Sequence, residues 1–148
     1  MEKLNLQRNE EEFYRLEVND KGEYIEFDLT DIGLADRIMK ASDKIIDLDN
    51  KYKKTAKEIE EKYKDDENAL IEEGTKLKLN ACLEMRKIFD SFLGDGACQK
   101  IFGNKNNYWQ FLNLMEALEP HYEKMRINMK KAKNKLVNKY LNKEKDVM

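Results

Sequence analysis

The sequence is poor in residues that break helices and in residues that build disulfide or metal frameworks. Its 148 residues include one proline, six glycines, one histidine and two cysteines. So few helix breakers exclude a fold of many short strands and turns and favour long helices. Cys82 and Cys98 form no C-x-x-C pair and have no histidine cluster nearby, so neither a disulfide framework nor a zinc site is indicated. We interpret both as free thiols in a reducing compartment.

Long hydrophobic runs are also missing. No stretch approaches the roughly 20 apolar residues that cross a bilayer. The first residues lack the apolar core of a signal peptide, so we expect a soluble cytoplasmic protein without a membrane role. No sign of charge dominates, because 28 Lys and Arg residues stand against 30 Asp and Glu, giving a net charge of -2.

The charge is nevertheless distributed unevenly. Residues 1–30 carry nine acidic and four basic side chains, whereas residues 121–148 carry nine basic and three acidic ones. Cations are favoured near a helix C-terminus by the helix dipole. We therefore interpret the basic segment as a solvated helix end in preference to a nucleic-acid contact. A contact with an acidic protein, such as the N-terminus of another copy, is a third interpretation.

Alternating apolar and polar residues open the chain. Alternation over residues 13–28, interrupted by turn formers at 19–22, predicts a β-hairpin. Thr30 and Asp31 can then cap the N-terminus of a helix.

Apolar residues next recur at alternating spacings of four and three, the pattern of helices that pack along one face. Residues 31–93 hold two such segments, and without Gly or Pro near residues 60–70 they could form a helical hairpin or one long helix. The Gly-rich residues 94–107 are predicted to be a connector. A third helix is predicted over 108–143, with a kink or break at Glu119 before Pro120. The first stripe is Leu34, Ile38, Ala41, Ile45, Leu48, Tyr52, Thr55 and Ile59, and the second is Leu70, Gly74, Leu77, Ala81, Met85, Ile88 and Phe92.

The predicted fold is therefore a single, mainly α domain over residues 1–148. An N-terminal β-hairpin is followed by a bundle of three long helices with a Gly-rich connector.

Residues that could act in catalysis or metal binding are present, but the sequence shows no partner residues for them. The aspartates between Asp28 and Asp49 alternate with lysines, as on a solvated helix face. His121 has no evident nucleophile or orienting partner and is expected to cap or pack. Cys98 has only weak support for a lowered pKa, so a buried or idle thiol is the preferred interpretation. We expect no enzymatic activity, no catalytic residue, no cofactor and no metal site.

The densest aromatic cluster is Tyr108, Trp109 and Phe111. Adjacent residues of a helix diverge by about 100°, so the three cannot share one face. Trp109 is expected to be partly exposed, and exposed Trp residues are frequent interface anchors. Packing of all three against the hairpin or the connector is an equally good alternative.

Three segments together resemble a known family. Residues 27–31 precede the first long helix, residues 89–103 hold the Gly-rich connector with its Ile-Phe-Gly end, and residues 112–121 end in Leu-Glu-Pro-His. Over roughly residues 27–125 the chain resembles the small tail assembly chaperones of phages and phage-like particles from Gram-positive bacteria. The resemblance implies binding of the tape measure protein, which such chaperones keep soluble until the tail tube forms, in the bacterial host cytoplasm.

A chaperone of this kind needs apolar surface for amphipathic helices. The expected partner-binding surface comprises Phe102, Tyr108, Trp109, Leu112 and Met115, and self-association into a homo-oligomer is expected. Three alternatives remain open: an oligomeric coiled-coil adaptor that dimerises through the Leu34–Ile59 stripe, a small nucleic-acid-associated protein, and an inhibitor protein of phage origin.

Overall fold

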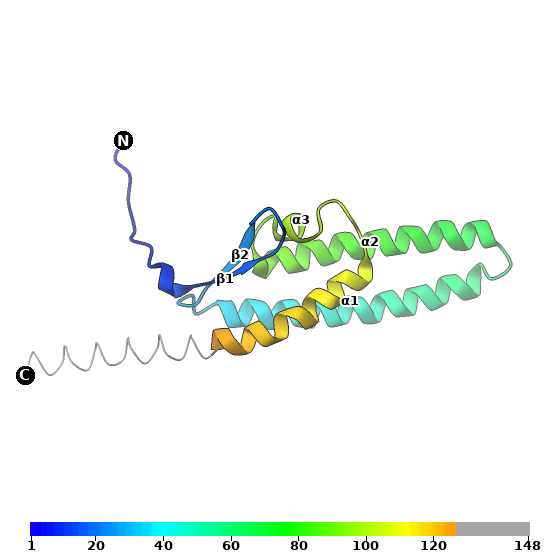
Figure 1. The fold of residues 1–148 in the computed structure, drawn as a ribbon. Helices are drawn as coiled ribbons and strands as arrows, with labels where there is room; N and C mark the ends of the chain where they lie inside the picture. Colours follow the sequence, from blue (N-terminus) through cyan, green and yellow to red (C-terminus); the bar gives the residue numbers. More distant parts are fainter. Residues whose placement is uncertain (127–148) are drawn as a thin grey trace, which may run out of the picture.

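The computed structural model describes residues 1–126. The chain is mainly helical, and an N-terminal antiparallel two-stranded hairpin precedes the helices, as the sequence predicted (Figure 1). Among the described residues, none of the helices is both long and apolar enough to cross a membrane. The elements are a short 3-10 turn η1 (Glu10–Glu12), β1 (Phe13–Glu17), β2 (Tyr24–Asp28), α1 (Leu34–Lys62), α2 (Glu67–Leu93), α3 (Ala97–Phe102) and a helix over residues 108–126.

The β-hairpin forms around a glycine turn. Gly22 has a φ of 79°, a conformation that favours glycine. The Asn19 side chain accepts hydrogen bonds from the backbone N–H groups of Lys21 and Glu23, which closes the turn. In the resulting register Leu16 lies opposite Ile25. Alternate residues of β2 therefore face the core, where Ile25 and Phe27 are buried.

The first long helix begins later than the sequence predicted. Its N-terminal boundary is Gly33, without a side-chain cap, and the expected capping role of Thr30 and Asp31 is wrong. The Asp31 carboxylate instead accepts hydrogen bonds from the Gly33 backbone N–H at 2.9 Å and from Arg37 at 2.6 Å. Because these partners hold Asp31 in the preceding turn, the helix starts at Leu34.

Helices α1 and α2 form an antiparallel hairpin. The chain turns at residues 63–66, and Asp66 caps α2 by accepting a hydrogen bond from the Ala69 N–H at 3.1 Å. Every position of the two apolar stripes is buried or half-buried, whereas the intervening positions are largely exposed. The regular spacing therefore aligns the stripes along the contact between α1 and α2.

The helical hairpin has two differently packed halves. In the inner half, the helix over residues 108–126 crosses α1, and the β-hairpin and α3 lie near the end of α2 (Figure 1). The outer half extends beyond these elements as a pair of helices. Between Ile45 and Ala81 no residue is buried, whereas Met85, Phe89 and Phe111 are completely covered in the inner half. The hydrophobic core therefore occupies one end of the molecule.

The helix over residues 108–126 is continuous through Pro120, so the chain does not break at Glu119, one of the two outcomes that the sequence predicted there. Proline removes one backbone hydrogen bond, at a cost of about 3 kcal/mol in a helix interior. Leu118 and Met125, on either side of Pro120, are both buried in the core. Their packing holds both halves of the helix in place. The predicted continuation to residue 143 lies outside the described residues.

Candidate functional site

The connector between α2 and the last described helix is built on glycines with positive φ. Gly96 precedes α3 with a φ of 77°, and Gly103 follows it with a φ of 61°. Both conformations are strained for residues with a side chain. Gly96 occupies the N-cap position of α3 and provides no side-chain hydrogen bond to it. Two sharp turns therefore place α3 against α2 and aim the chain back towards α1.

Arg86 of α2 fixes the second half of the connector. Its guanidinium donates to the backbone carbonyls of Gly103 and Lys105, both at 2.8 Å, and to the Asn106 side chain at 2.9 Å. Asn107 then starts the last described helix, because its side chain accepts a hydrogen bond from the Trp109 backbone N–H at 3.1 Å. The aromatic cluster is thus held by a clamp from α2 and a local cap.

Tyr108 is buried, and its place in the expected exposed surface is wrong. Its side chain is 5% exposed, and its ring stacks on that of Tyr52 with centroids 4.3 Å apart. Its hydroxyl donates to the Asp49 carboxylate at 2.5 Å. Burial, together with the bond to Asp49, raises the pKa of Tyr108 well above its usual value. Tyr108 therefore fastens the helix to α1 and is not available to a partner.

Trp109 points away from the core. It is 65% exposed, which confirms the expectation that this member of the aromatic cluster is partly exposed. Its ring meets the edge of Tyr108, with centroids 6.0 Å apart. A large aromatic side chain held at its base and otherwise open to solvent is a typical interface anchor.

The remaining expected partner-binding residues, from α3 and the last described helix, are all partly buried. Phe102 is half-buried, with its ring 4.9 Å from that of Phe111. Leu112 and Met115 are also half-buried and pack against the core. Because Leu112 and Met115 are three residues apart, they share one side of the helix. The structure therefore places Phe102, Leu112 and Met115 at the edge of the core, whereas Trp109 is largely exposed.

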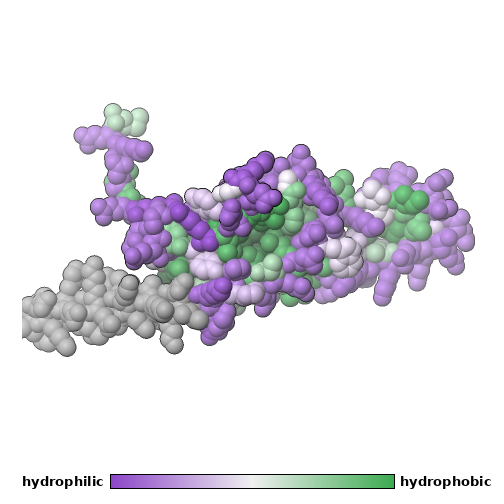
Figure 2. Space-filling model, viewed as in Figure 1, coloured by the Kyte–Doolittle hydropathy of each residue, from purple (hydrophilic) through white to green (hydrophobic). Residues whose placement is uncertain are grey.

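Half-buried apolar side chains also gather between the β-hairpin and the helix over residues 108–126. Figure 2 shows this apolar area in the middle of the viewed face, whereas the outer half of the helical hairpin is mostly hydrophilic with one smaller apolar patch. Partly buried hydrophobic residues that pack against the core come from the hairpin, α3 and the last described helix: Leu16, Val18, Ile101, Phe102 and Leu114.

The residues capable of chemistry are occupied by structural contacts. Cys82 and Cys98 are buried free thiols. Burial and the neighbouring Asp90 raise the pKa of the Cys98 thiol to about 12, which opposes formation of the thiolate. His121 packs on the hairpin, with its Nδ1 2.7 Å from the Tyr14 hydroxyl. Within residues 1–126 no group of three or more His, Cys, Asp or Glu side chains is placed to hold a metal ion.

Sequence reasoning did not single out Arg86, and it treated Asp49 only as part of a solvated face. The hydrogen-bond partners of Arg86 lie 17 to 20 residues away in the chain, and the partner of Asp49 lies 59 residues away. Local periodicity therefore gives no sign of these contacts. The position of these two residues beside the apolar stripes is the one feature of the sequence that points to these contacts. Arg86 and Asp49 each directly follow a residue of an apolar stripe, and such flanking positions face neighbouring helices in a bundle.

Residues 21–146 match the model of a family of unknown function, DUF6673. No curated protein and no solved structure matches the chain. The match covers both the β2 strand and all the described helices, so the chain belongs to the DUF6673 family.

Proposed function

We propose that this protein is a phage tail assembly chaperone that binds the tape measure protein and keeps it soluble during tail assembly. The observation that carries the proposal is the exposure of Trp109, because 65% of this large aromatic residue faces solvent beside half-buried apolar residues. The proposal takes the fold as a bundle of three long helices with a Gly-rich connector. In this proposal the helix over residues 108–126 is the third long helix.

The proposed client-binding surface centres on Trp109 and Leu112 and continues onto α1. Asp49 bonds to Tyr108, so the side of α1 that carries Asp49 faces the last described helix. Ile46 lies nearly one turn before Asp49, on the same side of α1, and is 50% exposed. Met39 lies two turns earlier than Ile46 and is 67% exposed. The apolar face of an amphipathic client helix would find several anchors here.

Acidic residues border this surface. Glu116, Glu119 and Glu123 follow Leu112 at spacings of four, three and four, so they share its side of the helix. All three are exposed. Opposite charges at the edge of an interface steer association and fix register. The expected client segment is therefore an amphipathic helix with an apolar stripe and Lys or Arg at its margin, a composition that the long helical tape measure protein can supply.

The test is co-expression of this chain with a tape measure protein, followed by affinity purification and measurement of the soluble client fraction. The expected result is co-purification, with client solubility dependent on this chain. A Trp109→Ala and Leu112→Ala double variant should lose most of the bound client. Leu83→Ala, which trims a 46% exposed apolar residue on α2, is the matched control and should retain it.

Circular dichroism of each variant separates lost binding from lost folding. A client that stays insoluble beside the folded wild-type chain would refute the proposed function. Equal losses from the double variant and from Leu83→Ala would refute the assigned surface.

The coiled-coil adaptor alternative relies on the Leu34–Ile59 stripe as a dimer contact. That stripe already packs on α2 of the same chain, and Leu34, Ala41 and Ile45 are buried there. The described contacts therefore favour the chaperone over this alternative. Most of the basic residues of the nucleic-acid alternative, from Lys130 onwards, lie outside the described residues.

A further inference from the structure

A cleft runs along one side of β2, away from the proposed client-binding surface. Its volume is about 530 Å³. One wall is formed by residues 22–26, and the other by the end of α2 and by α3. The lining residues of that second wall are Leu93, Gly94, Asp95, Ala97 and Lys100.

The wall formed by β2 presents backbone hydrogen-bonding groups. The Val18 N–H donates to the Glu23 carbonyl at 2.9 Å. Because hydrogen-bonded pairs alternate in an antiparallel ladder, residues 23, 25 and 27 direct their backbone groups to β1. Tyr24 and Glu26 therefore direct theirs to the opposite edge. The Lys100 ammonium, which lines the cleft, donates to the Tyr24 carbonyl at 3.3 Å, so that edge opens into the cleft.

The N-terminal arm, residues 1–7, is an exposed extended segment with the pattern of a strand. Leu4 and Leu6 are 86% and 85% exposed, and they alternate with Lys3, Asn5 and Gln7. Within the described part of the chain, no hydrogen bond or ion pair involves residues 1–7, and the arm leaves the body of the molecule (Figure 1). Two apolar residues at a spacing of two present one apolar face when the arm is extended.

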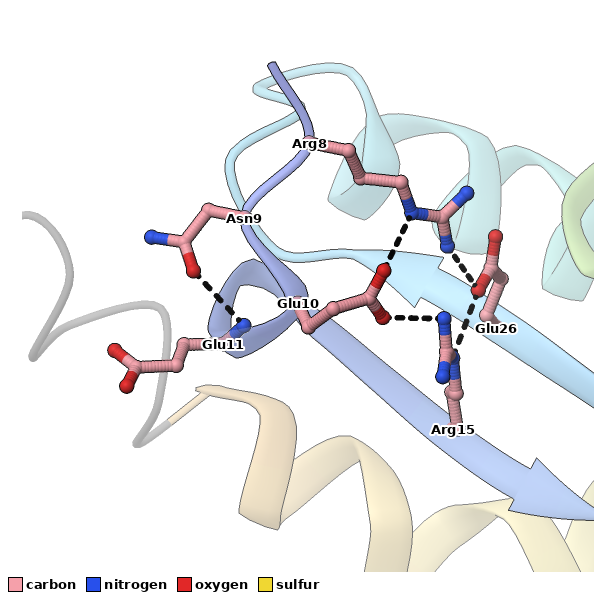
Figure 3. A network of polar contacts seen from close by, with 6 residues as sticks. All are labelled: Arg8, Asn9, Glu10, Glu11, Arg15 and Glu26. Atoms are coloured by element: carbon pink, nitrogen blue, oxygen red, sulfur yellow. Dashed lines mark hydrogen bonds and ion pairs between the residues drawn. The ribbon is translucent and has the colours of Figure 1, made fainter.

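The root of the arm is fixed on the outer face of the β-hairpin. Figure 3 shows Arg8 between Glu10 and Glu26, with Arg15 paired to the same two carboxylates. The Arg8 guanidinium lies 2.5 Å from the Glu26 carboxylate and 3.9 Å from the centroid of the Phe13 ring. These contacts hold residue 8 in place. They direct the arm away from its own cleft, which lies towards the turn at Gly22.

We propose that the N-terminal arm of one copy docks as an added strand on the β2 edge of a second copy. The exposed backbone edge supplies the hydrogen bonds, as in other strand-addition contacts. Leu4 and Leu6 lie on the face of the added strand that carries Ile25, beside the end of α2 at Leu93, and Lys3 points to the opposite face, which carries Glu26.

The lengths of the two segments are compatible. Seven extended residues reach roughly 23 Å, against about 17 Å for the five residues of β2. The arm can therefore span the whole strand.

Sedimentation velocity over a range of protein concentrations tests, in the full chain, whether the arm of one copy docks on a second copy. We expect concentration-dependent self-association, weakened at least tenfold by a Leu4→Asp and Leu6→Asp double variant. Ile71→Asp, on the outer half of the helical hairpin, is the matched control because Ile71 is also a largely exposed apolar residue. A wild-type chain that stays monomeric at all concentrations, or equal weakening by Ile71→Asp, would overturn the proposal.

Disulfide trapping tests which surface the arm occupies. A Leu4→Cys variant is mixed with an Asp95→Cys variant of different mass under mild oxidation. The native cysteines are buried and do not compete. We expect a covalent mixed dimer. Absence of the mixed dimer, or a disulfide formed only within single chains of the Leu4→Cys and Asp95→Cys double variant, would overturn the proposal. Neither assay requires the client protein, so both outcomes are independent of the chaperone function.

Discussion

Arg86 should be a principal stabiliser of the connector, although it lies on the edge of α2. Arg86→Met keeps most of the apolar stem and removes three hydrogen bonds to residues 103–106. Bonds from a charged donor contribute about 1.5–3 kcal/mol each when buried. Because Arg86 is half-exposed and water can replace part of each bond, about 1 kcal/mol each is a better value here. The expected loss is therefore about 3 kcal/mol in the free energy of unfolding.

Thermal unfolding followed by circular dichroism at 222 nm checks this value. For a chain of this length, the loss corresponds to a decrease in Tm of roughly 6–12 °C. Lys87→Met is the matched control, because Lys87 is the next residue of α2, is exposed and donates no hydrogen bond to the connector among the described residues. Amide exchange at residues 103–107 should accelerate in Arg86→Met alone. A decrease in Tm equal to that of Lys87→Met would refute the assignment of Arg86 as the clamp.

Three further predictions concern the core and its buried ionisable groups. Phe111→Ala should lower the free energy of unfolding by about 3–5 kcal/mol in urea titrations, because the ring is fully buried, whereas Trp109→Ala should change it by less than about 0.5 kcal/mol. Cys98 should resist alkylation at pH 8 in the native protein and react in urea, since burial raises the pKa of its thiol to about 12; rapid native labelling would contradict this. Burial also raises the pKa of Tyr122 to about 12, against about 10 for an unfolded tyrosine, so its contribution to stability is complete below pH 10 and is lost as the pH rises towards 12. Tyr122→Phe should therefore flatten the decrease in stability over that range, and an unchanged slope would refute the assignment.

Local patterns in the sequence predicted the helical stripes and the hairpin turn because both depend on short-range geometry. A spacing of four and three places side chains on one face whatever the rest of the chain does, and an Asn-Asp-Lys-Gly run favours a turn on its own. The start of α1 was predicted too early because the Asp31 carboxylate can accept hydrogen bonds in two ways. It can cap a helix that starts after residue 31, or it can bind Gly33 and Arg37 in the turn before the helix, as it does here. Both arrangements involve nearby residues, so the sequence does not show which one forms.

The candidate site was less predictable because its burial depends on distant residues. Trp109 and Tyr108 are neighbours of similar character in the sequence. Tyr108 is buried because Tyr52 and Asp49, more than 50 residues earlier, provide a stacking surface and a hydrogen-bond acceptor. Pro120 is accommodated for the same reason, since core packing of Leu118 and Met125 outweighs a local preference for a break.

The two halves of the helical hairpin differ in how many other elements pack on them, and they should therefore differ in stability. Its inner half is clamped by a third helix, whereas its outer half, around the turn at residues 63–66, has only the contact between α1 and α2. The free energy of local opening should therefore decline steadily from Met85 towards that turn, since fewer apolar contacts resist it. The tip can fray and close again while the core stays intact. The core end of the molecule should therefore be stiffer than the tip, and Trp109 directly follows Tyr108, which stacks on Tyr52 of α1.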